Sequence, residues 1–174
     1  NNEKIFKSLS EKDNVMSIAE FKKFTFSLDK SSNHVILVNP SNMGNLGTII
    51  RSMAAFSFLD LAIIKPSCDV FDPKVIRASM GGIFNIRFKL FDSFNEYLEE
   101  FKDRSLYPFM LQAKDELRSI KVTSPFSLIF GNEATGLPKE FLNIGKPLII
   151  KQSPLVDSIN LDNAVSIALY TLSK

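Results

Sequence analysis

The residues of this chain most suited to chemistry begin in the stretch NPSNMGNLGTIIRSMAAF, residues 39–56. A turn-rich run leads to Asn45 and then to Arg51, which interrupts an apolar helical pattern. A guanidinium among buried apolar side chains is costly unless an anionic group meets it. Arg51 is therefore either a residue of the helix surface or a group with a function. Asn45 is either the N-cap of the helix or a functional contact.

A second cluster lies in FGNEATGLP, which follows an apolar run. It contains Gly131, Glu133 and Gly136. Glycines allow a ligand to approach the backbone closely, whereas a plain turn ahead of a helix that starts at Pro138 needs no ligand. The stretch by itself leaves both interpretations open.

A third cluster lies in KQSPLVDSIN, immediately before a long apolar helical pattern. Ser158 and Asn160 are both residue types that cap helices, yet one helix uses only one N-cap. Capping therefore explains one of these residues and hardly both.

Strand and helix patterns alternate along the chain and must position these clusters. Strands are expected at 34–39, 59–65, 83–91, 106–111, 126–131 and 147–151. Helices are expected around 46–54, from Asp72 to Gly81-Gly82, at 93–103, after Pro138 and at 161–172.

This alternation predicts an α/β fold, with a mostly parallel sheet and helices on both faces. Ligands of such sheets bind at the carboxyl ends of the strands, in the loops that lead into helices. The loops 40–47, 131–138 and 151–160 are therefore the expected binding region.

The composition narrows the classes of function. The chain has 174 residues, of which 45% are apolar and 23% charged, as expected of one globular domain, here over 33–174 after a segment or linker over 1–32. No apolar run reaches the roughly 20 residues of a membrane helix, and the first residues lack a signal-peptide pattern. The single cysteine excludes an internal disulfide and a multi-Cys zinc site. The single histidine, His34, argues against a His-based metal centre and a Ser/His triad, so no metal is expected. A cytoplasmic location follows as an expectation, and the net charge of +2 permits a nucleic-acid partner.

Taken together and in this order, the three clusters resemble the motifs of the SpoU/TrmH family of RNA ribose 2′-O-methyltransferases, within the SPOUT superfamily. The resemblance extends over about residues 34–172. Motif 1 matches Asn45 and Arg51, and motif 2 matches the Gly-x-Glu of the second cluster. Motif 3, Ser-x-Asn before an apolar helix, matches the third cluster. The loop 151–157 departs from the family pattern, because Lys151 and Pro154 replace a usual proline and a common glycine.

The resemblance implies an S-adenosylmethionine-dependent enzyme that methylates a ribose 2′-hydroxyl in rRNA or tRNA. It also implies a C-terminal deep trefoil knot, a homodimer whose site draws on both subunits, and a segment 1–32 that ends an RNA-recognition domain. The implied cofactor-binding residues are Leu111, Gly131, Gly136, Ile150, Ser158 and Ile159. The implied catalytic residues are Arg51, Asn45, Glu133, Ser158 and Asn160.

The implied roles of these residues follow from their chemistry. An arginine is a poor general base, so Arg51 is expected to bind a phosphate and stabilise developing alkoxide charge, with its guanidinium held by Glu133. The remaining polar side chains are expected to orient the ribose, Arg51 and the cofactor by hydrogen bonds. They are those of Asn45, Ser158 and Asn160. The alternative is a catalytically silent RNA-binding or assembly factor on the same scaffold. The retained motif residues favour the enzyme.

Overall fold

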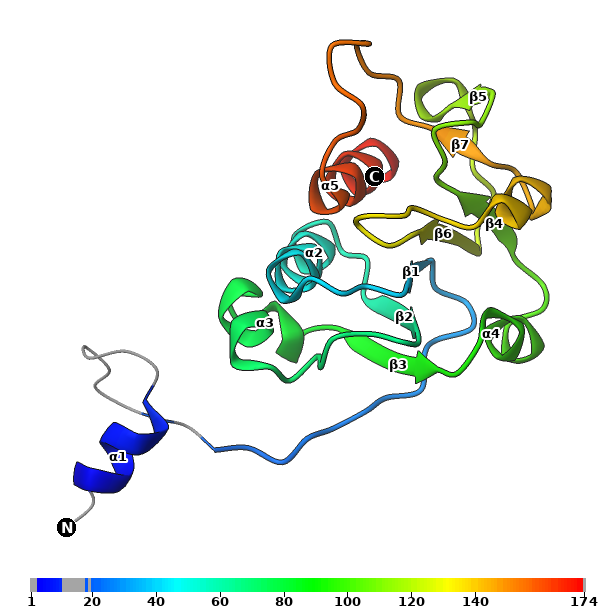
Figure 1. Cartoon of the computed structure of the whole chain (residues 1–174). Coiled ribbons are helices and arrows are strands. Elements are labelled where there is room, and N and C mark those ends of the chain that lie inside the picture. The colour runs from blue at the N-terminus through cyan, green and yellow to red at the C-terminus, as the bar shows by residue number, and fades with distance from the viewer. Residues whose placement is uncertain (1–2, 11–17, 19, 174) are drawn as a thin grey trace.

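The computed structural model describes residues 3–10, 18 and 20–173. Its centre is a parallel sheet with strand order β3-β2-β1-β6-β4 (Figure 1). The strands of this sheet are β1 (His34–Val38), β2 (Asp60–Ile64), β3 (Arg87–Phe91), β4 (Ser105–Pro108) and β6 (Phe126–Phe130). A second sheet pairs the short strands β5 (Asp115–Glu116) and β7 (Leu148–Ile149), also in parallel.

Helices connect these strands. The α-helices are α1 (Glu3–Leu9), α2 (Met43–Ala55), α3 (Pro73–Ala78), α4 (Phe94–Glu100) and α5 (Leu161–Leu172). Short 3-10 helices cover Gly82–Phe84, Leu117–Ser119 and Lys139–Asn143. The helix expected from Asp72 is α3: the Asp72 side chain caps it by accepting from the Lys74 N–H, and proline occupies its first turn. It ends at Ala78, before the expected stop at Gly81-Gly82.

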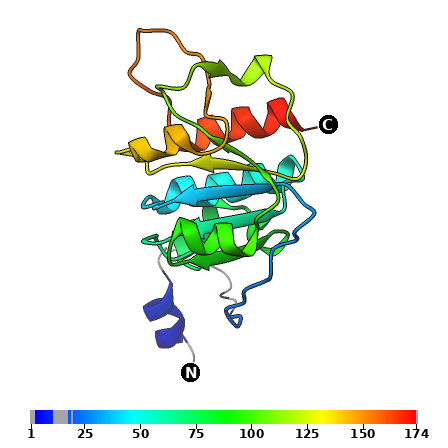
Figure 2. The same ribbon diagram turned by 90° about the vertical axis from the view of Figure 1, so that its right-hand side faces the viewer.

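Two layers of helices enclose the sheet (Figures 1 and 2). In β1, Val35 and Leu37 join one core cluster with side chains of α2, α3 and α5, while Ile36 joins the other cluster with side chains of α4 and of the 3-10 helix Lys139–Asn143. Both faces of a central strand are therefore buried, which is why β1 reads as an uninterrupted apolar run. The expected parallel sheet with helices on both faces is confirmed.

Some expected strand limits were wrong. The strand expected at 83–91 begins only at Arg87, because the 3-10 turn Gly82–Phe84 precedes it. Gly81, at φ 85°, turns the chain there, and the Phe84 side chain is 56% exposed. The strand expected at 147–151 is the short β7, which lies outside the main sheet. An alternating or apolar pattern does not indicate where a turn interrupts it or which sheet it joins.

Residues 20–28, of the segment that precedes the domain, run beside the edge strand β3. The Phe26 N–H donates to the Phe88 carbonyl at 3.4 Å. The Phe24 ring lies 5.3 Å from the Phe71 ring and 5.7 Å from the Phe88 ring, measured between centroids. The segment thus covers part of an otherwise open sheet edge. Parts of the expected segment 1–32 lie outside the described residues.

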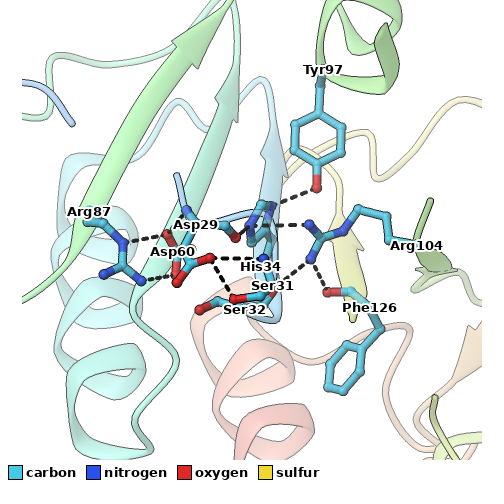
Figure 3. A network of polar contacts seen from close by, with 9 residues as sticks. All are labelled: Asp29, Ser31, Ser32, His34, Asp60, Arg87, Tyr97, Arg104 and Phe126. Atoms are coloured by element: carbon cyan, nitrogen blue, oxygen red, sulfur yellow. Dashed lines mark hydrogen bonds and ion pairs between the residues drawn. The ribbon is translucent and has the colours of Figure 1, made fainter. Parts of the chain in front are cut away.

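A polar network occupies the amino ends of the strands (Figure 3). His34, Asp60 and Arg87 are the first residues of β1, β2 and β3. The fully buried Asp60 carboxylate accepts from Arg87 Nε at 2.7 Å and from the Asp29 N–H at 2.9 Å. These bonds compensate the burial of the charge, and they lie at the end of the sheet opposite to the expected binding loops.

The His34 imidazole belongs to the same network and is fully buried. Its Nε2 lies 2.8 Å from the Asp29 carbonyl, which can only accept, and 3.3 Å from Arg104 Nη1, which can only donate. The shorter contact places the proton on Nε2. Its Nδ1 then accepts from the Tyr97 hydroxyl at 2.8 Å. Burial, and then the nearby positive charge of Arg104, lower the pKa of His34 to about 4. The folded protein therefore holds this imidazole neutral.

This burial predicts a pH dependence of stability. The unfolded state binds a proton at His34 below pH 6.5, whereas the folded state binds it only near pH 4. The contribution of His34 is therefore complete above pH 6.5 and is lost as the pH falls through about 4, with a total loss of about 3 kcal/mol. Urea denaturation at several pH values would measure it. His34→Gln should flatten the curve between these limits, and an unchanged slope would contradict the assignment.

Candidate active site

The three loops expected to bind a ligand follow the carboxyl ends of β1, β6 and β7. Segments that follow β4, β6 and β7 surround a cavity of about 270 Å³ at this edge. Its wall is largely apolar, with Phe109, Phe130, Leu137 and Leu148 among the side chains that line it. Apolar walls with a few polar groups are typical of small-molecule sites.

All residues expected to bind the cofactor line this single cavity. They are Leu111 after β4, Gly131 and Gly136 after β6, and Ile150, Ser158 and Ile159 after β7. Glu133 lines it too, whereas Asn45, Arg51 and Asn160 do not. The structure therefore brings the second motif and Ser158 of the third motif together around one space, and leaves both residues of the first motif outside it.

Two glycines shape the loop after β6. The Asn132 N–H donates to the Gly136 carbonyl at 3.2 Å, and the Gly136 N–H donates to the Asn132 carbonyl at 2.8 Å. A Cβ at Gly131 would lie 2.1 Å from the Gly136 carbonyl carbon, and Gly136 itself has φ +67°. Only glycine at both positions allows this tight turn beside the cavity.

Glu133 joins this turn to the loop that begins α2. Its carboxylate accepts from Ser41 Oγ at 2.9 Å and from the N–H groups of Ser41 and Asn42 at 3.2 and 3.1 Å. Burial alone would raise the pKa of Glu133, but the N–H groups of Glu133 itself, Ser41 and Asn42 outweigh it and hold the pKa below its ordinary value. The carboxylate is thus a charged link between the first and second motifs.

Asn132 strengthens the same link. Its Nδ2 donates to the Asn39 carbonyl at 2.8 Å and lies 3.2 Å from Ser41 Oγ. Sequence reasoning did not select Ser41, Asn42 or Asn132. A signal for Asn42 existed, since an asparagine just before an apolar helical pattern is a common N-cap. The other two carry no sequence signal for this contact.

The N-cap of α2 is Asn42, and the interpretation of Asn45 as the cap was wrong. The Asn42 side chain accepts from the Asn45 N–H at 3.0 Å. The Asn45 side chain instead points toward the second motif, with its Nδ2 3.5 Å from Glu133 Oε1. At that distance the contact is weak.

Arg51 lies on the exposed side of α2, not among its buried residues. The buried residues of α2 are Leu46, Gly47, Ile49, Ile50 and Met53. At about 100° per residue, these positions span an arc of roughly 160° on one side of the helix, and Arg51 falls about 40° beyond its edge. Among the described residues, the Arg51 side chain has no hydrogen-bond or ion-pair partner.

The expected bond between Glu133 and Arg51 is therefore not formed within the chain. Glu133 binds at the N-cap of α2, and Arg51 lies nine positions further along, or about 13 Å at the helical rise of 1.5 Å per residue. The exposed Arg51 side chain is therefore open to an anionic group from outside the described chain.

Asn160 is the N-cap residue of α5 by position, but its side chain makes no capping bond. Ser158 is exposed and lines the cavity. Capping therefore uses the side chain of neither residue, and both polar groups stay available to a ligand.

Removal of the Glu133 carboxylate should loosen the junction between the loops. Glu133→Ala leaves the Ser41 and Asn42 N–H groups without their acceptor, and we expect a loss of about 1–2 kcal/mol in the free energy of unfolding because water replaces part of the contact. Urea denaturation measures this loss. Glu140→Ala, an exposed glutamate of the next turn, is the control and should have little effect. Equal stability of both variants would show that the link is not stabilising.

Two kinds of feature are absent from the described part of the chain. No group of three or more His, Cys, Asp and Glu residues there is arranged to hold a metal ion. Within the same residues, no helix combines the length and apolar character needed to cross a membrane.

Comparison with known proteins gives consistent matches. Residues 32–170 match the model of the SpoU rRNA Methylase family. A 23S rRNA (uridine(2479)-2′-O)-methyltransferase of Streptomyces viridochromogenes is 30% identical over 144 residues, covering 78% of this chain and 50% of that protein. The chain spans about half the length of several curated relatives that it matches.

Solved structures match as well. The AdoMet-bound rRNA methyltransferase of Sinorhizobium meliloti has a TM-score of 0.84 and 27% identity, over 98% of this chain and 69% of that one. A structure solved to explain the 2-OH methylation of C/U34 on tRNA has a TM-score of 0.75 and 29% identity, over 82% of this chain and 94% of that one.

Proposed function

This chain belongs to the SpoU rRNA methylase family, and from that premise we propose that it transfers a methyl group from S-adenosylmethionine to a ribose 2′-hydroxyl of rRNA or tRNA. The observation that carries the proposal is the single cavity lined by every residue that the family motifs select for the cofactor. The relatives named above that act on a 2′-hydroxyl, one on 23S rRNA and one on tRNA, support the reaction class.

The cavity suits S-adenosylmethionine. Apolar side chains, the backbone of the tight turn at Gly131 and Gly136, and the backbone at Ile150 and Ile159 would hold the ligand. The buried Oε1 of Gln152, another lining residue, has no hydrogen-bond partner among the described residues, so a ligand with hydrogen-bond donors fits it. When bound, the cofactor supplies a methyl group on a positively charged sulfur.

The chain's own residues would position the acceptor. Arg51 presents an exposed guanidinium that can bind an RNA phosphate in two bonds and stabilise negative charge on the 2′-oxygen. The guanidinium is a poor proton acceptor, so its role is electrostatic. Ser158 and Asn160, whose side chains are not used in capping, would orient the ribose and the cofactor. Glu133 would keep the loop before α2 in place. Alignment of two reactants supplies a large part of the acceleration in such reactions.

We also propose a homodimer in which Arg51 of one subunit completes the site of the partner. Two observations support this arrangement. Within one chain, Arg51 is about 13 Å along α2 from the contact of Glu133 with Asn42. On α5, Ile167 is 42% exposed and Tyr170 is 71% exposed, and apolar surface of this kind is common at subunit contacts.

Three further features belong to the proposal. The C-terminal part, in which β7 and α5 follow the main sheet, would form the deep trefoil knot. Residues 33–174 would be the catalytic domain, and residues 1–32 would be a segment or linker that ends an RNA-recognition domain. An enzyme that modifies rRNA or tRNA is expected in the cytoplasm.

The test is methyl transfer to RNA. The protein is incubated with radiolabelled S-adenosylmethionine and separately with unmethylated rRNA and tRNA, and the labelled nucleotide is mapped. Label on a ribose 2′-oxygen is the expected result, and the pool that accepts it identifies the substrate. Binding of the cofactor without transfer to any RNA would favour the silent assembly factor. Absence of cofactor binding would refute the proposal.

A further inference from the structure

The side chain of Gln152 makes one hydrogen bond, through its nitrogen, and leaves its oxygen without a partner among the described residues. Its Nε2 donates to the Asp157 carbonyl at 3.3 Å. Its Oε1 is buried and has no donor among the described residues. Buried polar atoms are rarely left in this state, and each such case calls for an explanation.

The orientation of the amide supports this assignment. If Nε2 and Oε1 were exchanged, the side-chain oxygen would face the Asp157 carbonyl, and two acceptors cannot bond to each other. Gln152 therefore keeps its Oε1 as the unpaired acceptor. The same contact ties Gln152 to the loop that leads to Ser158, another residue of the cavity wall.

The other polar side chains of the cavity differ from Gln152 in this respect. Glu133 and Asn132 are engaged by the loop before α2. Gln112 is exposed and can bond to water. Gln152 lines the cavity and carries an acceptor that no described residue satisfies, and a turn of its side chain would present this acceptor to a molecule in the cavity.

We infer that Gln152 Oε1 accepts a hydrogen bond from the S-adenosyl ligand and so contributes to the recognition of the cofactor. The inference rests on the proposed function. The ligand carries three kinds of donor: the exocyclic amine of adenine, the ribose hydroxyls and the ammonium of the amino-acid part. All three supply the N–H or O–H that the orphaned oxygen lacks, and the experiment separates them.

The test measures binding, not turnover. Isothermal titration calorimetry with S-adenosylhomocysteine is carried out on the wild type, on Gln152→Met and on the control Asn95→Met, which removes an exposed amide of α4 that does not line the cavity. At Gln152, methionine keeps the size of the side chain and removes the acceptor. We expect affinity to fall about tenfold in Gln152→Met, the effect of one lost hydrogen bond, and to change less than about twofold in the control.

Analogues then identify the donor. S-inosylhomocysteine lacks the adenine amine, 5′-methylthioadenosine lacks the amino-acid part, and the 2′- and 3′-deoxy forms of S-adenosylhomocysteine each lack one hydroxyl. The difference between wild type and Gln152→Met should disappear for the one analogue that lacks the bonded group.

Two results overturn the inference alone. One is equal affinity of the wild type and a folded Gln152→Met. The other is an equal loss for every analogue, which assigns Gln152 to the support of its loop. If the wild type itself does not bind S-adenosylhomocysteine, the inference and the proposed function both fail.

Discussion

Replacement of Arg51 by alanine is expected to reduce methyl transfer by at least about 100-fold and to leave cofactor affinity within about twofold of the wild type. The physical reason is the location of the side chain. Arg51 is exposed, has no partner among the described residues and does not line the cavity, so its loss removes charge from the acceptor side without disturbing the cofactor site. Single-turnover transfer and calorimetry with S-adenosylhomocysteine measure the two quantities.

Two further variants define the role of the guanidinium. Arg51→Lys keeps the charge but not the planar fork that binds phosphate in two bonds, so its activity should lie between those of wild type and Arg51→Ala. Arg118→Ala removes another exposed arginine and should leave transfer unchanged. Wild-type turnover in Arg51→Ala would refute the assignment. A parallel loss of cofactor affinity would mean that Arg51 supports the fold of the site.

The second large effect is expected at Gly131. A Cβ there would lie 2.1 Å from the Gly136 carbonyl carbon and 2.3 Å from the Leu137 nitrogen. Both are backbone atoms, so no rotamer change can relieve the clash, and the turn beside the cavity must move. We expect Gly131→Ala to weaken binding of S-adenosylhomocysteine by about 100-fold and to abolish transfer at ordinary cofactor concentration.

The matched control is Gly44→Ala. A Cβ at Gly44 meets only the tip of the Asn42 side chain, at 3.2 Å, and this atom can shift. Cofactor affinity should therefore stay near the wild-type value. Thermal denaturation followed by circular dichroism must show that both variants fold. A folded Gly131→Ala that binds as tightly as the wild type would show that this turn is not part of the cofactor site.

The same two variants test the composite site. Coexpression of Arg51→Ala with Gly131→Ala should restore about a quarter of the wild-type activity, because about half of the dimers are mixed and each mixed dimer has one intact pair of Arg51 and cavity. If both groups act within one subunit, the mixture stays inactive.

Much of the architecture was determined by the sequence itself. The buried strands β1, β2 and β6 were found as apolar runs, and α5 was found from its apolar stripe. These patterns are local, since the period of the apolar residues follows from the geometry of the element. The order of strands and helices then predicted a parallel sheet with its binding loops at one edge, where the cavity was found.

Other features were decided only by the tertiary structure. The beginning of β3 at Arg87 depends on a turn at Gly81, which an alternating pattern does not reveal. The link from Glu133 to Ser41 and Asn42 joins residues more than 90 positions apart, and it depends on β1 and β6 being neighbours in the sheet.

The same limit applies to the motif residues. Sequence spacing selected Arg51 and Glu133 together, but the rise of α2 keeps them apart within one chain. It selected Ser158 and Ile159 but not Gln152, because the unpaired state of Gln152 Oε1 arises from the path of the loop and from what surrounds it. Sequence determined which residue types and elements are present. Only the packing of distant segments decided which of their groups meet and which still need a partner.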